Sequence, residues 1–339
     1  MTKPDVSIIV AVYNAENYIG RCLDSLIMQT YKNIEVICVN DASTDHSQQI
    51  IDSYLLKDER IHSIVHPQNM NAGGAMNDGI KAAQGEYVCI VDNDDWITPN
   101  AIEILINESG NLKIDFVAPD WCEFYNEERK INHHNLIVGA SKEENCEYAL
   151  KYGIRMLGCL IRRELFYNND LFFPENSFFE DNAIANCLLY CANDIKAVGE
   201  VFYYYHVVDG SSSRSINISK IKDRISTTRL FRGNFIRLGF LTSRNKDIVE
   251  FRYLCYSALT IMMLVGDGSA EARKLLNIVC KDIKSMLPNP LLTQMRPDYA
   301  DILSKPIFLF YYYKYCHILS RFELIIPKRL LSWIRRIFV

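Results

Sequence analysis

The first ninety residues alternate short apolar runs with stretches of helical periodicity, and this alternation constrains the fold more than any other feature. Nearly continuous apolar runs occupy residues 6–12, 34–39, 61–65 and 87–91. Such runs are expected of parallel strands that are covered on both faces. Between them, apolar side chains recur at the three- and four-residue spacing of amphipathic helices. The order strand, helix, strand, helix predicts an α/β fold with a doubly wound, mostly parallel sheet flanked by helices.

Polar residues gather where these strands end. Tyr13 and Asn14 follow the first strand, Asp41 follows the second, and residues 92–95, with the sequence Asp-Asn-Asp-Asp, follow the fourth. In such sheets, ligands bind at the carboxyl ends of the strands, near a topological switch point. Carboxylates at this spacing suit a hard divalent cation, Mg²⁺ or Mn²⁺, which also contacts substrate phosphates. The alternative is an ordinary polar loop that caps the following helix.

The loop after the third strand contains a glycine pair, Gly73 and Gly74, which allows close approach of the backbone to a ligand or simply makes a turn. The chain contains neither the Gly-x-Gly-x-x-Gly of dinucleotide-binding folds nor the Gly-Lys-Ser/Thr of phosphate loops. A nicotinamide-dependent enzyme and a P-loop nucleotidase are therefore disfavoured. The net charge of -4 also argues against a general nucleic-acid-binding protein.

Cysteine usage and hydropathy indicate the compartment. The 339 residues include eleven scattered cysteines with no Cys-x-x-Cys pair, which predicts a reduced, cytosolic chain. No apolar signal segment opens the sequence, and no uninterrupted apolar stretch reaches transmembrane length. The tail is different: residues 301–339 carry seven Lys or Arg against two Asp or Glu, interleaved with aromatic side chains. Residues 306–319 are rich in aromatic and aliphatic side chains, and residues 327–339 have the pattern of a basic amphipathic helix. The region 306–339 therefore predicts peripheral contact with a membrane, or else packing on this protein or a partner.

Several motifs resemble one enzyme family. Residues 6–19 read Val-Ser-Ile-Ile-Val-Ala-Val-Tyr-Asn-Ala-Glu-Asn-Tyr-Ile, and residues 40–45 read Asn-Asp-Ala-Ser-Thr-Asp. Residues 75–79 read Ala-Met-Asn-Asp-Gly, and the Asp-x-Asp pattern lies at 92–95. Together these stretches resemble the family 2 glycosyltransferases, inverting enzymes with the GT-A fold, and the likeness extends to about Ser213.

The resemblance implies a role for each matching position. A nucleotide, most often uridine in this family, would be held by Val12, Tyr13, Asn14, Glu16, Asp41, Gly73, Asn77, Asp92 and Asn93. Asp94, with Asp92, would bind the Mn or Mg ion that bridges the diphosphate. His206 could be a further metal ligand, a hydrogen-bond donor to phosphate, or only a loop residue.

Residues 178–181, Phe-Phe-Glu-Asp, introduce an apolar helical pattern. Acidic residues at a helix N-terminus are favourable through the helix dipole, which could be their whole explanation. The resemblance implies instead that Asp181 is the general base that takes a proton from the acceptor hydroxyl, and that Glu180 orients the acceptor. Residues 126–147, polar and irregular, are expected to form a loop near the acceptor.

The chain departs from the family pattern at four positions. Ala11 stands for the usual Pro, Ala42 for Gly, Met76 for Arg, and His206 for the first Arg of a segment that closes over the diphosphate. That segment, residues 203–214 here, is expected to be a mobile loop. Met76 removes a cation from the nucleotide or acceptor region.

The sequence therefore predicts three regions: a GT-A nucleotide-sugar-binding and catalytic domain over 1–215, a helical region over 216–300, and the basic tail over 301–339. The expected reaction moves a sugar from a nucleotide diphosphate to a hydroxyl of a glycan or lipid-linked glycan. Its expected setting is polysaccharide or lipopolysaccharide biosynthesis at the cytoplasmic face of the inner membrane. The alternatives are a non-catalytic sugar-nucleotide-binding or glycan-binding module on the same fold, and a nucleotidyltransferase, whose Gly-rich signature is missing.

Overall fold

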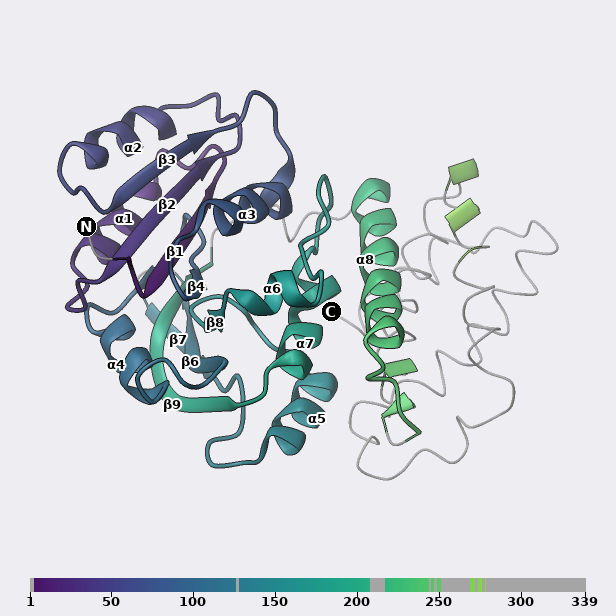
Figure 1. Ribbon diagram of the computed structural model, residues 1–339. Helices are drawn as coiled ribbons and strands as arrows, with labels where there is room; N and C mark the ends of the chain where they lie inside the picture. The colour runs from purple at the N-terminus through teal and green to yellow at the C-terminus, as the bar shows by residue number, and fades with distance from the viewer. Residues whose placement is uncertain are drawn as a thin grey trace. The chain divides into compact units, whose positions relative to one another are not determined.

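The computed structural model describes residues 3–125, 128–207 and 217–243, and the short stretches 245–246, 249–250, 269–271, 274–275 and 278, with only the backbone of 128–131. The chain divides into two compact units (Figure 1). The first consists of Met1–Ser215 and Arg229–Asn245, and the second of Ile216–Thr228 and Lys246–Val339. The site considered below lies within the first unit.

A nine-stranded mixed sheet forms the centre of the first unit, with the strand order β3-β2-β1-β4-β8-β6-β9-β5 and with β7 paired to β6. The strands are β1 (Val6–Val12), β2 (Ile34–Asn40), β3 (Ile61–Val65), β4 (Tyr87–Ile90), β5 (Trp96–Ile97), β6 (Phe116–Tyr125), β7 (Glu128–His133), β8 (Leu160–Arg162) and β9 (Ile195–His206). β1 to β4 pair in parallel, as the sequence predicts. Beyond β4 the pairing is largely antiparallel, and only β6 and β9 run parallel.

The helices follow the strands in the order expected of an α/β fold. They are α1 (Ile19–Ile27), α2 (Ser47–Leu55), α3 (Asn71–Ala82), α4 (Ala101–Glu108), α5 (Lys142–Tyr152), α6 (Glu164–Asn168), α7 (Asp181–Cys191) and α8 (Ile218–Arg237). The helical pattern that the sequence shows from about Ile218 is thus α8.

Helices cover both faces of the parallel strands. Ile8 and Val10 of β1 share a buried core with Leu23 of α1. Ile9, the residue between them, faces Gly79 of α3, where an added Cβ would lie only 2.5 Å from Ile9 Cγ2. Because neighbouring strand residues point to opposite faces, α1 and α3 lie on opposite sides of β1. This leaves the carboxyl ends of the strands open between helices.

One expectation about the middle of the chain is wrong. Residues 126–147 are not an irregular loop, because β7 and the first half of α5 lie within this stretch. α5 begins with a capping box: Ser141 Oγ accepts from the Glu144 backbone N–H, and the Glu144 carboxylate accepts from the Ser141 N–H. The polar composition of the first half of α5 obscures its helical periodicity, although the Ser-x-x-Glu capping pattern is present in the sequence.

Residues 203–206 are likewise not a mobile loop but the end of β9, where Tyr203 and Tyr204 each pair with both β6 and β5. Residues 208–214 of that expected loop lie outside the described residues, as does the tail over 301–339. The eight cysteines that the structure describes are free thiols. Within the described part of the chain, no helix is both long and apolar enough to span a membrane.

Candidate active site

Polar residues from four strands meet at one edge of the sheet. Tyr13 follows β1, Asp41 follows β2, His66 follows β3, and the acidic loop at 92–95 follows β4. Since β1 to β4 run parallel, their carboxyl ends share this edge. The sequence therefore predicted correctly where the polar residues come together.

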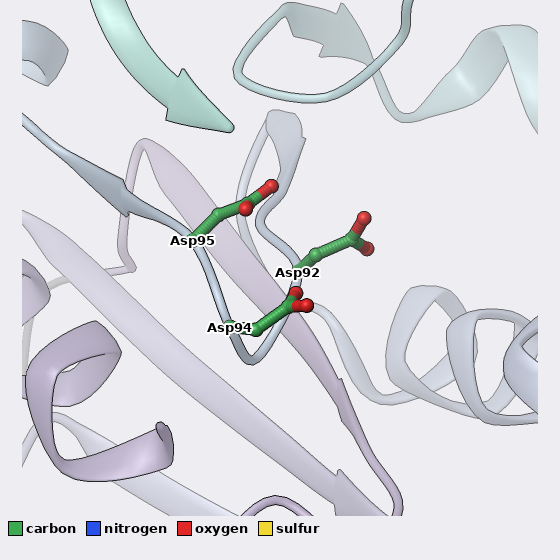
Figure 2. Close-up of side chains that lie close together, drawn as sticks. All are labelled: Asp92, Asp94 and Asp95. Atoms are coloured by element: carbon green, nitrogen blue, oxygen red, sulfur yellow. The ribbon is translucent and has the colours of Figure 1, made fainter. Parts of the chain in front are cut away.

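Three carboxylates cluster in the loop after β4 (Figure 2). Asp92, Asp94 and Asp95 each offer an oxygen, and these oxygens lie within 4.8 Å of one another. Asp95 is fully buried and already engaged: Oδ2 accepts from Tyr203 Oη at 2.5 Å, and Oδ1 accepts from the His206 backbone N–H at 2.7 Å. The other two aspartates have no hydrogen bond from another residue to their carboxylate oxygens within the described part of the chain.

Burial and mutual repulsion disfavour the ionised form of these three carboxyls, and a bound cation would offset both effects. Burial and then the negative charge of Asp94 raise the pKa of Asp92 to about 7, with Arg155 opposing the rise. Burial also raises the pKa of Asp94, and burial with its two acidic neighbours raises that of Asp95 well above its usual range. Carboxylates that repel one another and lack donors are the oxygen ligands that Mg²⁺ or Mn²⁺ takes. The residues present therefore fit a divalent cation, held by Asp92 and Asp94 and backed by Asp95.

The side chain of His206 does not join this group. Its ring packs edge-on against Tyr18, with centroids 5.6 Å apart, and also lies near Trp96. Nδ1 is buried without a hydrogen-bond partner among the described residues, and burial lowers the pKa of the ring. The backbone of His206, rather than its imidazole, touches the acidic loop through Asp95. A metal-ligand role for the imidazole stays a prediction.

The loops after β1 and β2 are locked together. Asn14 Oδ1 accepts from the Thr44 backbone N–H at 2.8 Å, while the Asn14 N–H donates to Ser43 Oγ at 3.0 Å. Glu16 Oε2 accepts from the His46 backbone N–H at 3.0 Å. Asn14 and Glu16 thus have a structural role, because their hydrogen bonds connect the loops after β1 and β2. A contact with a nucleotide would be additional to this role.

Two further side chains lie at the ends of these strands: Tyr13 follows β1, and Asp41 follows β2. Tyr13 is 49% exposed, so one face of an aromatic ring is available for stacking. Asp41 is 2% exposed; its N–H donates to Val12 O at 2.8 Å. The amide of Asn93 is occupied, because its Nδ2 donates to Ala11 O at 2.8 Å.

Asp181 is the first residue of α7, and Glu180 immediately precedes it. Phe179, the residue before the pair, has φ +62°, a left-handed conformation that turns the chain into the helix. The negative charge of Asp181 raises the pKa of Asp92, which places the two side chains within electrostatic range. Burial, followed by the charge of Asp181, raises the pKa of Glu180 to about 8. Glu180 is therefore protonated near neutral pH and can donate a hydrogen bond, whereas a general base must accept one.

Gly73 and Asn77 of α3 hold the segment that leads to this acidic pair. A Cβ at Gly73 would lie 2.5 Å from Pro174 O and 3.3 Å from the Glu180 Cβ. Asn77 is buried, and its amide forms two hydrogen bonds with the Phe173 backbone, at 2.8 and 2.9 Å. These contacts give both residues a structural reason to be present, and they bring Glu180 and Asp181 to the strand edge.

Arg155 is a cation that the motifs do not reveal. Its guanidinium carbon lies 4.0 Å from the Trp121 ring centroid and 4.3 Å from that of Tyr205, so the group contacts both rings, which meet edge to face. Its backbone is fixed by two hydrogen bonds with the Asn135 amide. No carboxylate among the described residues forms an ion pair with it, yet its charge lowers the pKa of Asp92. Met76, in contrast, is buried and offers no charge.

Fold and site together define a class: an α/β protein that has three clustered carboxylates at the end of a parallel strand and an acidic pair at a helix N-terminus. The model of glycosyl transferase family 2 matches residues 7–169. These residues form a domain of this family, and the domain has the GT-A fold.

Two relatives from bacteria are similar to this chain over 60% and 62% of its length. EpsJ of Bacillus subtilis, described as an uncharacterized glycosyltransferase, is 32% identical over 60% of this chain and 61% of its own length. The glycosyltransferase GlyG of Streptococcus pneumoniae is 29% identical over 62% of this chain and 73% of its own. The chain thus spans about three fifths of EpsJ.

Solved structures share the fold. TarS of S. aureus (residues 1–349, in complex with UDP) superposes with a TM-score of 0.66 at 22% identity, covering 84% of this chain and 81% of that one. The mannosyltransferase PcManGT of Pyrobaculum calidifontis, in complex with GDP-Man and Mn²⁺, gives a TM-score of 0.52 at 15% identity over 91% of this chain and 86% of its own.

Proposed function

We propose that the protein transfers a hexosyl group, with inversion, from a UDP-sugar to a hydroxyl of a glycan or lipid-linked glycan. One observation carries the proposal: an acid at the N-terminus of α7 is close enough to Asp92 for its charge to raise the pKa of that carboxyl, at the strand edge that also carries Asp41. A nucleotide, a diphosphate-bound cation and an acceptor hydroxyl can then occupy one continuous site.

The donor is proposed to lie with its base between Tyr13 and Asp41 and its diphosphate beside Asp94. TarS has been solved with UDP and with UDP-GlcNAc, which supports uridine as the base, although PcManGT binds GDP-Man. Arg155 supplies the positive charge that Met76 removes from this region. A planar guanidinium in contact with two aromatic rings can donate to phosphate oxygens with little conformational freedom left to lose.

The proposed step is a single displacement. The Asp181 carboxylate takes the proton of the acceptor hydroxyl while that oxygen forms a bond to the anomeric carbon. The bond from this carbon to the phosphate oxygen breaks, and the nucleotide diphosphate leaves with the electron pair. Attack opposite to the leaving group inverts the anomeric configuration. Glu180, protonated near neutral pH, donates a hydrogen bond that orients the acceptor.

Asp92 and Asp94 would hold the Mn or Mg ion; PcManGT has been solved with Mn²⁺. When bound, such a cation stabilises the negative charge that develops on the diphosphate. The proposed cellular setting is the synthesis of a cell-surface polysaccharide at the cytoplasmic side of the membrane. One relative supports the polysaccharide part of this proposal: a poly(ribitol-phosphate) beta-glucosyltransferase of Bacillus spizizenii, 32% identical over 60% of this chain.

The test is a panel of UDP- and GDP-sugars with Mn²⁺ or a chelator, measuring nucleotide release and transfer. We expect one UDP-sugar to be hydrolysed slowly in a metal-dependent manner, with the activity lost in Asp94→Ala. Asp181→Asn is expected to bind that donor normally and to lower transfer by roughly 10²–10⁴-fold, the usual contribution of a general base.

Asp194→Asn is the matched control, because this exposed aspartate lies beyond the opposite end of α7. It should transfer like the wild type. If no nucleotide sugar is bound or turned over under any condition, the enzyme proposal fails and a non-catalytic module becomes the better reading. Full transfer by Asp181→Asn would instead remove only the general-base assignment.

A further inference from the structure

A buried histidine lies behind the carboxylate at the end of β2. His66 directly follows β3, its N–H donates to Asn40 O at 2.9 Å, and its side chain is 5% exposed. Ring Nδ1 lies 2.8 Å from Asp41 Oδ1, and ring Nε2 lies 3.1 Å from Asp78 Oδ2 on α3. The imidazole therefore lies between two carboxylates: that of Asp41, which follows β2, and that of Asp78 on α3.

The two contacts place one ring nitrogen beside each carboxylate. An ionised carboxylate only accepts hydrogen bonds, whereas a neutral imidazole has one N–H and one acceptor nitrogen. A ring that donates to both carboxylates therefore carries a proton on each nitrogen. Lys81 Nζ lies 2.8 Å from Asp78 Oδ1, so the Asp78 carboxylate lies between the ring and a cation. Adjacent opposite charges offset the cost of burying each one.

One carboxylate oxygen of Asp41 has hydrogen-bond partners, and the other has none among the described residues. Its Oδ1 accepts from the Met70 backbone N–H at 2.8 Å and from His66. Its Oδ2 is buried and has no hydrogen-bond partner in the described part of the chain. A buried carboxylate oxygen without a donor is costly, so this atom is a position where a ligand N–H would be stabilising.

We infer that His66 is the positioning residue for base recognition: as an imidazolium it holds Asp41 ionised and oriented, so that Oδ2 accepts from the N–H edge of uracil. This inference rests on the proposed function, because it takes the donor's base to lie beside Asp41. His66 itself touches Asp41 and not the nucleotide. It holds the Oδ1 side of the Asp41 carboxylate, and the ligand N–H donates to Oδ2.

The chemistry specifies which base is accepted. Uracil presents an N3–H donor, whereas cytosine presents an unprotonated N3 acceptor at the same place. A lone pair of cytosine would face the Asp41 carboxylate, so CDP is rejected. Methylation of uracil N3 removes the donor and adds bulk. A site built for a hydrogen bond discriminates strongly against analogues that lack the donor, because the buried acceptor then stays unpaired.

The first experiment measures binding of UDP, N3-methyl-UDP and inorganic diphosphate by calorimetry, with Mn²⁺, to the full chain. His66→Gln is expected to weaken UDP binding roughly 10–100-fold, the range for hydrogen bonds to charged groups, with diphosphate binding unchanged. The preference for UDP over N3-methyl-UDP, large in the wild type, should largely disappear. In turnover, KM for the donor should rise while kcat stays near the wild-type value. Asp78→Asn, with a side chain that is 32% exposed, should show the same changes to a smaller degree.

Asp52→Asn on α2 is the matched control, since this exposed aspartate only accepts from the Gln48 side chain. It should bind all three ligands like the wild type. Independently, ¹⁵N NMR of the ring should show two protonated nitrogens in the ligand-free protein at neutral pH. A neutral His66 ring, or an unchanged preference for UDP in a folded His66→Gln or Asp78→Asn, would overturn the inference.

The two possible failures are distinguishable. If the wild type binds no UDP, the proposed donor site is wrong, and the inference about base recognition falls with it, whatever the NMR shows. If the wild type binds UDP and distinguishes the N3-methyl analogue, but the variants do so equally well, the donor site stands and only the role of His66 is wrong.

Discussion

Ala42 adopts a backbone conformation that suits glycine. It has φ +59° in the loop after β2, at the position where the family pattern has Gly. A left-handed conformation costs a residue with a Cβ about 1–2 kcal/mol, while a new glycine costs about 0.4–1 kcal/mol through the unfolded chain. Ala42→Gly should therefore raise the free energy of unfolding by about 0.5–1 kcal/mol, measured by urea denaturation.

Ala140 supplies the control for this substitution. It lies in the irregular stretch before α5 and is not among the described residues with positive φ. Ala140→Gly should lower the free energy of unfolding, because only the cost in the unfolded chain remains. If both substitutions destabilise equally, strain at Ala42 is not a feature of the folded protein.

Asp92 makes metal binding depend on pH. Its pKa is raised to about 7, and a metal ligand must be deprotonated. Below about pH 7 a proton competes with the cation, so the apparent affinity for Mn²⁺ should rise by up to about tenfold per pH unit towards pH 7 and level off above it. Calorimetric titration with Mn²⁺ from pH 5.5 to 8.5 measures this dependence. Asp92→Asn should bind Mn²⁺ weakly and lose the steep region; an equally steep rise in this variant would show that another group titrates.

Residues with a motif were predictable, and residues that act through tertiary contacts were not. The Asp-x-Asp pattern led to Asp92 and Asp94 because their spacing alone carries chemistry. Asp95 was visible as a third carboxylate, but its bond to Tyr203 Oη depends on β9, more than a hundred residues away. Arg155 gave no sequence signal, since its surroundings form only when β6, β9 and the loop before β8 meet.

At the scale of elements, β9 and the loop before β8 support the acidic loop through one tyrosine. Tyr203 Oη donates to Asp95 and accepts from the Asp92 backbone N–H at 3.1 Å. Gly158 lies against the Tyr203 ring: with φ +74°, an added Cβ would lie 2.6 Å from Tyr203 Cδ2. Its absent side chain thus lets the ring reach the acidic loop.

Gly158→Ala should therefore destabilise the protein and weaken Mn²⁺ binding, by displacing Tyr203 from the acidic loop. We expect a loss of about 2–4 kcal/mol in the free energy of unfolding, from backbone strain together with overpacking. Mn²⁺ affinity should fall roughly tenfold or more, as when the support of a metal ligand is removed. Chemical denaturation and calorimetry measure the two effects.

Gly139→Ala is the control that separates the cost of backbone strain from the cost of the contact with Tyr203. Gly139 has φ +76°, but a Cβ there would meet no atom within 4 Å. This variant should show only the backbone cost, about 1–2 kcal/mol, with metal affinity unchanged. If the two alanine variants lose equal stability and bind Mn²⁺ equally well, the Tyr203 contact does not support the site.

The element pattern was readable from sequence where strands are buried on both faces, as in β1 to β4. It failed for β7 and for the end of β9, which contain many polar or aromatic residues and are defined by pairing with β6. Antiparallel pairing beyond β4 was also not predictable, because an apolar run does not indicate the direction of its neighbour. The acidic pair at 180–181, in contrast, was placed correctly at the start of a helix.

At the scale of the whole molecule, charge is unevenly distributed. Residues 301–339 carry seven basic and two acidic side chains, a net +5, within a chain of net -4, so the remainder carries -9. This tail lies outside the described residues, and its membrane role stays a prediction from sequence. A basic residue near an anionic leaflet contributes about 1 kcal/mol, and the effect is screened by salt. We therefore expect the full chain to bind vesicles containing anionic lipid, measured by co-sedimentation, and to be released at high salt.

Replacing Lys328, Arg329, Arg335 and Arg336 with glutamine should weaken this binding roughly a hundredfold or more, since up to about 4 kcal/mol of attraction is removed. The control has the same change of charge on four exposed lysines elsewhere: Lys32, Lys57, Lys113 and Lys196. It should bind vesicles as well as the wild type, because location and not net charge is responsible. Equal binding by both variants, or binding to neutral vesicles that salt does not reduce, would show that the basic tail does not act as an electrostatic anchor. In that case packing on the protein itself or on a partner becomes the explanation for its aromatic and basic pattern.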